Sequence, residues 1–171
     1  MHMSEVEHVL LSELLQWYRL QRHDFLNHWQ VIMGNLQLNQ PEKALAYMLE
    51  MIAEPQEEQK IAQIVEPQLA AMLLGFLIRL RREEITATID FPEGMKEEDF
   101  WQDHWREEYG EALYGYTREC LELSAQFRQL GKLDAEVFLY DEPGGLSCQF
   151  ILLDEENVLL DKMAKFIINS K

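Results

Sequence analysis

The chain has 171 residues, and with a hydrophobic content of 47% it can build one or two small domains around a sizeable core. Its 31 acidic and 15 basic residues give a net charge of −16, which argues against nucleic acid and anionic membranes as partners. No apolar run approaches the roughly 20 residues of a membrane span, and no secretion signal is visible, so we expect a cytoplasmic protein. Cys120 and Cys148 are far apart in sequence and have apolar neighbours, which predicts buried free thiols.

The first third of the sequence, residues 1–63, predicts a helical hairpin. Apolar residues recur at helical spacing over residues 4–38 with no proline and a single glycine, which predicts one long helix. The sequence Asn-Gln-Pro at 39–41 is expected to turn the chain, because Asn tolerates left-handed geometry and Pro favours the first turn of a helix. A second helix is expected at 41–53, with a Glu/Gln-rich continuation to about residue 63. So short a turn makes the two helices antiparallel.

The first helix has more apolar surface than one partner helix can cover. On a wheel of 100° per residue, one side is apolar and is formed by Leu11, Leu14, Tyr18, Phe25, Trp29, Ile32 and Leu36. Further apolar residues lie on both flanks of that side, namely Trp17 and Val31 on one and Leu15, Leu26 and Met33 on the other. We therefore expect two hairpins to pair as a homodimer with a four-helix bundle.

Residues 64–171 are expected to form a small second domain, which makes the whole chain an α+β protein. Helical periodicity is found at 66–82, 107–129 and 156–169, and strand patterns are found at 85–91, 133–140 and 146–153. A Pro-Gly-Gly loop joins the last two strands as a hairpin. The resulting order, helix–strand–helix–strand–strand–helix, suggests a sheet with helices on one face.

His23 lies on the side of the first helix that is not needed for packing. Five polar residues lie within about 40° of it on the wheel, namely Gln16, Arg19, Asn27, Gln30 and Gln37. A neutral imidazole can attack a phosphoryl group and pass it on, and the charges of Arg19 and Arg22 suit such an anion. The alternative is a solvated surface histidine with ordinary surface charges around it, and periodicity alone favours that alternative.

Other polar residues near His23 have less definite roles. Asn27, one turn later, is either a hydrogen-bond donor to a phosphoryl group or an ordinary polar helix residue. Asp24 points about 100° away from His23, so it either assists the histidine or only contacts solvent. His28 lies roughly 140° away and is expected to pack inside the bundle. His23, Asp24 and His28 share no common face, so we expect no metal site.

The run from Arg22 to Gly34, Arg-His-Asp-Phe-Leu-Asn-His-x-Gln-Val-Ile-x-Gly, resembles the phospho-acceptor histidine box of one group of two-component sensor kinases. In length and domain order the chain resembles the sporulation phosphotransferase B family, the small histidine phosphotransferases of the phosphorelay in spore-forming bacteria. The resemblance implies a homodimer in which His23 accepts the phosphoryl group and Asp24 assists as a base or orients the ring. It also implies a second domain like a degenerate ATP-binding domain.

The second domain lacks the nucleotide-binding motifs of a kinase. The helix expected at 107–129 contains no asparagine, and the chain has neither an Asp-x-Gly-x-Gly segment nor a Walker-type phosphate loop. We therefore expect no cofactor of its own and no ATP-dependent self-phosphorylation.

Together these features favour a phosphorelay phosphotransferase. His23 would accept a phosphoryl group from the aspartate of one response-regulator receiver domain and donate it to another, with Mg²⁺ bound on the receiver. Gln16 and Gln30 are candidates for docking contacts with these partners. The alternative is a non-catalytic dimeric docking or inhibitory module for a kinase or response regulator, and a third, weaker interpretation is a divergent kinase.

Overall fold

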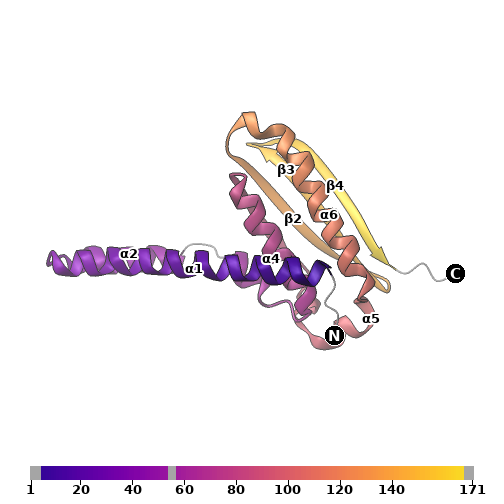
Figure 1. Cartoon of the computed structure of the whole chain (residues 1–171), viewed down its shortest axis with the longest axis horizontal. Helices are drawn as coiled ribbons and strands as arrows, with labels where there is room; N and C mark the ends of the chain where they lie inside the picture. The colour runs from indigo at the N-terminus through magenta and orange to yellow at the C-terminus, as the bar shows by residue number, and fades with distance from the viewer. Residues whose placement is uncertain (1–4, 54–56, 168–171) are drawn as a thin grey trace. The chain divides into compact units, whose positions relative to one another are not determined.

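The computed structural model describes residues 5–53 and 57–167 and shows an α+β protein (Figure 1). It divides into a helical unit, residues 11–53, and an α/β unit, which contains residues 5–10 and 57–167. The short N-terminal segment belongs to the α/β unit because Leu10 is buried in that unit's hydrophobic core.

The helical unit contains the predicted hairpin. α1 spans Glu5–Gln37, α2 spans Pro41–Ala53, and both predicted helices are confirmed. Asn39 adopts the left-handed conformation with φ 58°, as expected for an asparagine at a helix end. In Figure 1, α2 runs back along α1.

The α/β unit is built around one four-stranded sheet. Its strands are β1 (Ile85–Asp90), β2 (Leu133–Glu142), β3 (Gly145–Asp154) and β4 (Asn157–Ile167). Its helices are α3 (Glu57–Ile61), α4 (Pro67–Arg82), α5 (Glu98–His104) and α6 (Glu108–Ser124), with 3₁₀ turns η1 (Glu93–Lys96) and η2 (Ala125–Leu130). The strands are arranged in the order β1-β2-β3-β4, with β1 parallel to β2 and the other pairs antiparallel. The three predicted strands and the helix at 66–82 are confirmed, and the helix predicted at 107–129 ends as the 3₁₀ turn η2.

α4 and α6 cover one face of the sheet, as the sequence predicts. Phe76 of α4 packs on Phe150 of β3 with ring centroids 5.5 Å apart. On α6, Tyr116 packs edge-on against Phe166 of β4 and donates a hydrogen bond of 2.7 Å to the carbonyl oxygen of Lys162. Residues on this face alternate along each strand with outward residues, so the core lies between the two helices and the sheet.

The helix predicted at 156–169 is wrong, because the structure has the strand β4 there. The strand pairs with β3 along its whole length, so Leu160 and Phe166 lie opposite Leu152 and Leu146 and extend the apolar face. Cross-strand pairing of this kind overrides a local pattern that is also compatible with a helix. Glu155 turns the chain with φ 53°, a conformation uncommon for glutamate, so the turn gave no sequence signal. Residues 168 and 169 lie outside the described part of the chain.

The segment after the hairpin belongs to the α/β unit, so the predicted domain boundary after residue 63 falls inside this unit. α3 is attached to this unit by Ile61, which is buried in the core, and by a buried carboxylate. Glu57 is 9% exposed, and its Oε2 accepts a hydrogen bond of 2.8 Å from the backbone N–H of Ile89 in β1. Lys60 balances its charge at 3.0 Å. Residues 54–56, between α2 and α3, lie outside the described part of the chain.

Both cysteines are free and buried, as predicted. Burial disfavours the charged thiolate and raises the pKa of Cys120 and of Cys148 to about 12. Both thiols therefore remain protonated near neutral pH and behave as small apolar groups of the core.

Candidate functional site

His23 lies near the middle of α1 and reaches into solvent. Its side chain is 72% exposed, and that of the neighbouring Asp24 is 65% exposed. Because α1 continues for several turns on either side, the backbone under His23 is held rigidly by helical hydrogen bonds. The position combines a fixed Cα with an imidazole that an incoming molecule can reach.

Two side chains approach the same ring nitrogen of His23. Nδ2 of Asn27 lies 3.2 Å from Nδ1, and Oδ1 of Asp24 lies 3.6 Å from it. The structure thus brings Asn27 and Asp24 to His23. Asp24 does so although adjacent residues of a helix point about 100° apart. Among the described residues, no hydrogen bond involves Nε2 of His23. The ring therefore presents Nε2 to an incoming group while Nδ1 is engaged by its own helix.

The two arginines of the predicted site are also exposed on α1. Arg19 precedes His23 by one turn and Arg22 by one residue. Within the described part of the chain, neither makes an ion pair or hydrogen bond with His23 or Asp24. The carboxylate of Asp24 therefore does not neutralise the positive charge of either arginine.

Gln16 and Gln30 are exposed on α1, each about two turns from His23, one on either side. They extend the polar column of His23 along the helix. The structure contains no partner molecule, so their docking role stays a prediction.

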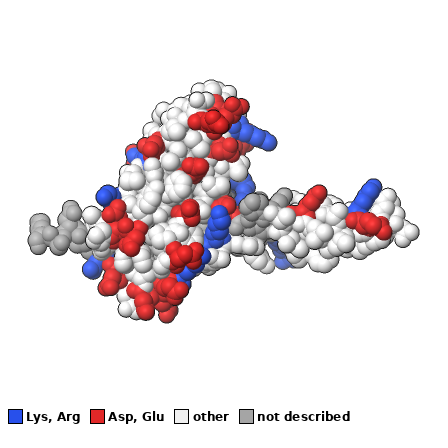
Figure 2. Space-filling view, turned by 180° about the vertical axis from the view of Figure 1, so that it is seen from behind, with Lys and Arg blue, Asp and Glu red and all other residues white. Residues whose placement is uncertain are grey.

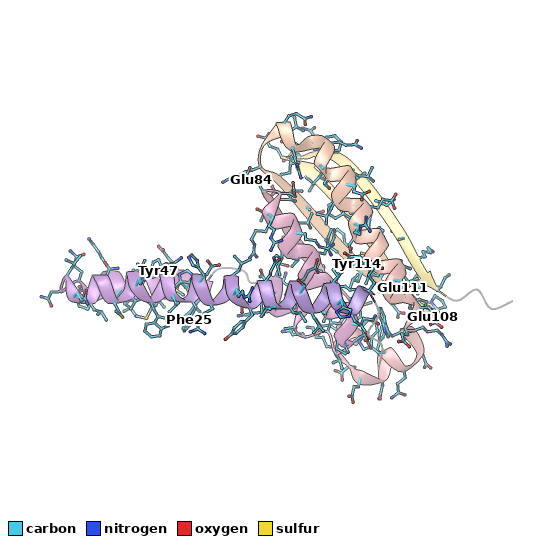
Figure 3. All side chains as sticks on the ribbon, viewed as in Figure 1. Phe25, Tyr47, Glu84, Glu108, Glu111 and Tyr114 are labelled. Carbon is cyan, nitrogen blue, oxygen red and sulfur yellow. The ribbon has the colours of Figure 1, made fainter. Side chains whose placement is uncertain are left out.

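Much of the apolar surface of the hairpin is exposed within one chain. Phe25 is 58% and Trp29 48% exposed, and their rings pack edge-to-face with centroids 5.9 Å apart. In Figure 3, Phe25 points away from the hairpin. Apolar residues of α2 are exposed as well, since Leu45, Leu49 and Ile52 are each more than half exposed. By contrast, Ile32 and Ala44 are buried. This hairpin covers only a small part of its own apolar surface.

His28 faces α2, in agreement with its predicted packing. Its Nδ1 lies 2.7 Å from the hydroxyl oxygen of Tyr47, and the two rings are 5.8 Å apart. Sequence reasoning did not single out Tyr47, which differs from its α2 neighbours in being an aromatic residue with a polar tip. This contact is a specific polar link between the two helices, so it fixes their register.

No helix among the described residues is both long and apolar enough to pass through a lipid bilayer.

Two comparisons with known proteins indicate what this chain is similar to. The family model for the alpha-helical domain of the SpoOB-type sensor kinases matches residues 2–64, which include the histidine box. The chain is also 26% identical over 134 residues to sporulation initiation phosphotransferase B of Bacillus subtilis (strain 168). That match covers 78% of this chain and 56% of the relative, so the chain spans little more than half of the relative's length. Both matches confirm the resemblance to the sporulation phosphotransferase B family that the sequence of α1 predicts.

The contact between His28 and Tyr47 leads to a stability prediction. Tyr47→Phe removes one half-buried hydrogen bond and should lower the free energy of unfolding by about 0.5–1.5 kcal/mol. The measurement is urea denaturation followed by circular dichroism at a fixed protein concentration. Tyr18→Phe is the matched control, because Tyr18 is on the same hairpin and 56% exposed. Equal stability of the two variants would contradict a structural role for the contact.

Proposed function

We propose that this chain is a phosphorelay histidine phosphotransferase. His23 accepts a phosphoryl group from the aspartyl phosphate of one response-regulator receiver domain and donates it to the aspartate of another. The observation that carries the proposal is the exposed imidazole of His23, with Asn27 and Asp24 beside Nδ1 and no intramolecular contact at Nε2 among the described residues. The family matches support a phosphorelay role, and the relative from Bacillus subtilis is named as a phosphotransferase.

The transfer is a displacement at phosphorus by the lone pair of Nε2. A new N–P bond forms, the P–O bond to the aspartate breaks, and the aspartate leaves as a carboxylate with the bonding electrons. Nε2 has this lone pair when the proton of the neutral ring is on Nδ1. The carboxylate of Asp24 favours that tautomer, and the amide of Asn27 can turn its oxygen to accept the same proton.

The positively charged ring formed by the attack keeps its proton on Nδ1. A carboxylate close to Nδ1, as in Asp24, stabilises this charge. Attack by the second aspartate on the phosphorus reverses the steps and restores the neutral imidazole. Asp24 and Asn27 therefore act at Nδ1 while phosphorus is bound at Nε2.

Arg19 and Arg22 assist the approach of the phosphoryl group. Both residues lie within about one helical turn of His23 along α1, and the charge of their guanidinium groups attracts the anionic phosphoryl oxygens. Since both are exposed, we expect them to affect the rate of encounter more than the strength of the complex. Gln16 and Gln30 would contact the receiver above and below His23, and the receiver would supply Mg²⁺.

The phosphoryl donor is a protein and not ATP. The sequence of α6 contains no asparagine, and the chain lacks the Gly-rich motifs that hold a nucleotide and its magnesium. A four-stranded sheet with α4 and α6 on one face is compatible with a degenerate ATP-binding domain, which would then serve in docking. We place the reaction in the cytoplasm, where receiver domains act.

The acting form is a homodimer. Two hairpins that pair through the exposed apolar surface around Phe25, Trp29 and Leu45 form a four-helix bundle. Each large side chain that becomes buried adds about 1.5–3 kcal/mol, so several of them support a stable dimer. His23 lies on the opposite side of α1 and stays accessible in this arrangement.

Phosphoryl transfer to His23 can be measured directly. A receiver domain with a radiolabelled aspartyl phosphate is mixed with the chain in the absence of ATP. The chain should gain label that is stable in base and labile in acid, and His23→Ala should gain none, because no other residue replaces the nucleophile.

His8→Ala is the matched control, since His8 is a second exposed histidine on α1. It should be labelled like the unchanged chain. If a folded, dimeric chain gains no label from several cognate receivers, the proposal is contradicted and the docking-module alternative is favoured.

Dimerisation can be tested by placing a charge on the apolar side of α1. Phe25→Glu should weaken the dimer by roughly a hundredfold, because a large apolar contact is lost and a carboxylate would be buried. Sedimentation velocity at micromolar concentration measures the change. Gln30→Glu adds the same charge on the polar side and should remain dimeric. Equal behaviour of the two variants would exclude this surface as the interface.

A further inference from the structure

The sheet of the α/β unit has a second face, opposite to α4 and α6, which combines apolar and acidic residues. The open face is defined here by six outward residues: Glu136, Phe138 and Tyr140 of β2, Ile151 of β3, and Asp161 and Met163 of β4. Tyr140 is 39% and Met163 51% exposed. The rings of Phe138 and Tyr140 stack at 6.3 Å with an interplanar angle of 25°. These side chains form a continuous surface across three strands.

The ladder registers place the two acids on either side of an apolar centre. Ile151 is directly opposite Glu136 on β2 and directly opposite Asp161 on β4. Gln149 is the next residue of β3 on this face, two positions before Ile151, and it lies between Phe138 of β2 and Met163 of β4. Gln149 also accepts a hydrogen bond of 2.7 Å from the hydroxyl of Tyr140 and donates one of 2.8 Å to Asp161. Tyr140, Gln149 and Asp161 are therefore linked by hydrogen bonds across β2, β3 and β4.

The charge of the open face is not balanced within the sheet. Opposite charges on neighbouring strands stabilise a sheet, but the lateral neighbours of Glu136 are Thr88 and Ile151. Lys165, which also points outward on β4, is paired with Glu142 at 3.4 Å. Within the described residues, neither Glu136 nor Asp161 makes an ion pair. In Figure 2, acidic side chains over the α/β unit clearly outnumber basic ones.

We propose that the open face binds a basic amphipathic helix of a partner protein. Adjacent strands are about 4.8 Å apart, so β2 and β4 are separated by about 10 Å, which is close to the diameter of an α-helix. A helix lying along β3 would place its apolar stripe on Ile151, Phe138 and Met163. Lys or Arg residues on both of its flanks would then meet Glu136 on one side and Asp161 on the other.

The stacked rings of Phe138 and Tyr140 add a second source of selectivity for cations. A guanidinium or ammonium group over an aromatic ring is attracted by the ring's negative face. The chemistry of the surface thus favours an apolar segment with positive flanks over a neutral or acidic one. This binding site is independent of His23 and of the proposed phosphoryl transfer.

Fluorescence anisotropy with the full chain tests the proposal. The probe is a labelled synthetic helix of about 18 residues with a leucine stripe and Lys/Arg on both flanks. Glu136→Gln combined with Asp161→Asn should weaken binding by about tenfold, since two ion pairs with the peptide are lost. Glu108→Gln combined with Glu111→Gln removes the same charge from α6, where Figure 3 labels both residues, and should leave the affinity within about twofold.

Three outcomes would overturn the proposal. The first is that the basic peptide does not bind the unchanged chain. The second is an equal loss of affinity in the two double variants, which would mean attraction by overall charge alone. The third is equally tight binding of a peptide with glutamine in place of Lys and Arg. His23→Ala should bind the basic peptide normally, so failure of this proposal is distinct from failure of the phosphotransfer proposal.

Discussion

The helical repeat of α1 is the constraint on which the proposed site depends. At 3.6 residues per turn, one helix can carry an apolar side for packing and a polar side for chemistry, and the histidine box uses both within seven residues. Phe25 and Trp29 project on the apolar side, whereas His23 and Asn27 share the polar side one turn apart. The hydrogen bond at Nδ1 follows from this spacing, because side chains at i and i+4 are neighbours on a helix surface.

The same repeat links the proposed dimer to the proposed chemistry. Much of the apolar surface of α1 and α2 is exposed in one chain, and burying it against a second hairpin would hold α1 straight and rigid. The contact between His28 and Tyr47 fixes the register of α1 against α2 from within the hairpin. His23 has to meet a phosphorylated aspartate on another protein. A rigid α1 and a fixed register between α1 and α2 both help it to do so, since small displacements of reacting atoms slow a transfer strongly.

Sequence patterns predicted the hairpin well because its information is local. The long apolar period, the left-handed Asn39 and the proline that opens α2 each determine their own stretch of chain. The helical periodicity of α1 also predicted that His23 is exposed and that Asn27 lies beside it. The contact of His23 with Asp24 was not predicted, because it depends on side-chain rotamers. The link to Tyr47 was missed because it joins residues 19 apart.

The α/β unit shows where local patterns fail. β4 was predicted as a helix, and only its pairing with β3 over ten residue pairs identifies it as a strand. The turn before it depends on Glu155 in a left-handed conformation, for which the sequence offers no glycine or asparagine. α3 joins this unit through the buried carboxylate of Glu57, which is bound to the backbone of β1, and through Ile61 in the hydrophobic core. Contacts between distant segments of this kind leave no periodic signal in the sequence.

The central claim is that Nε2 of His23 carries the phosphoryl group. Phosphorus NMR of the phosphorylated chain tests it most directly, because the two ring positions of phosphohistidine give separate resonances and mass spectrometry of its peptides identifies the residue. The account predicts a phosphoryl group on Nε2 of His23, since Asn27 and Asp24 engage Nδ1. A phosphoryl group on Nδ1, or on any other histidine, would contradict it.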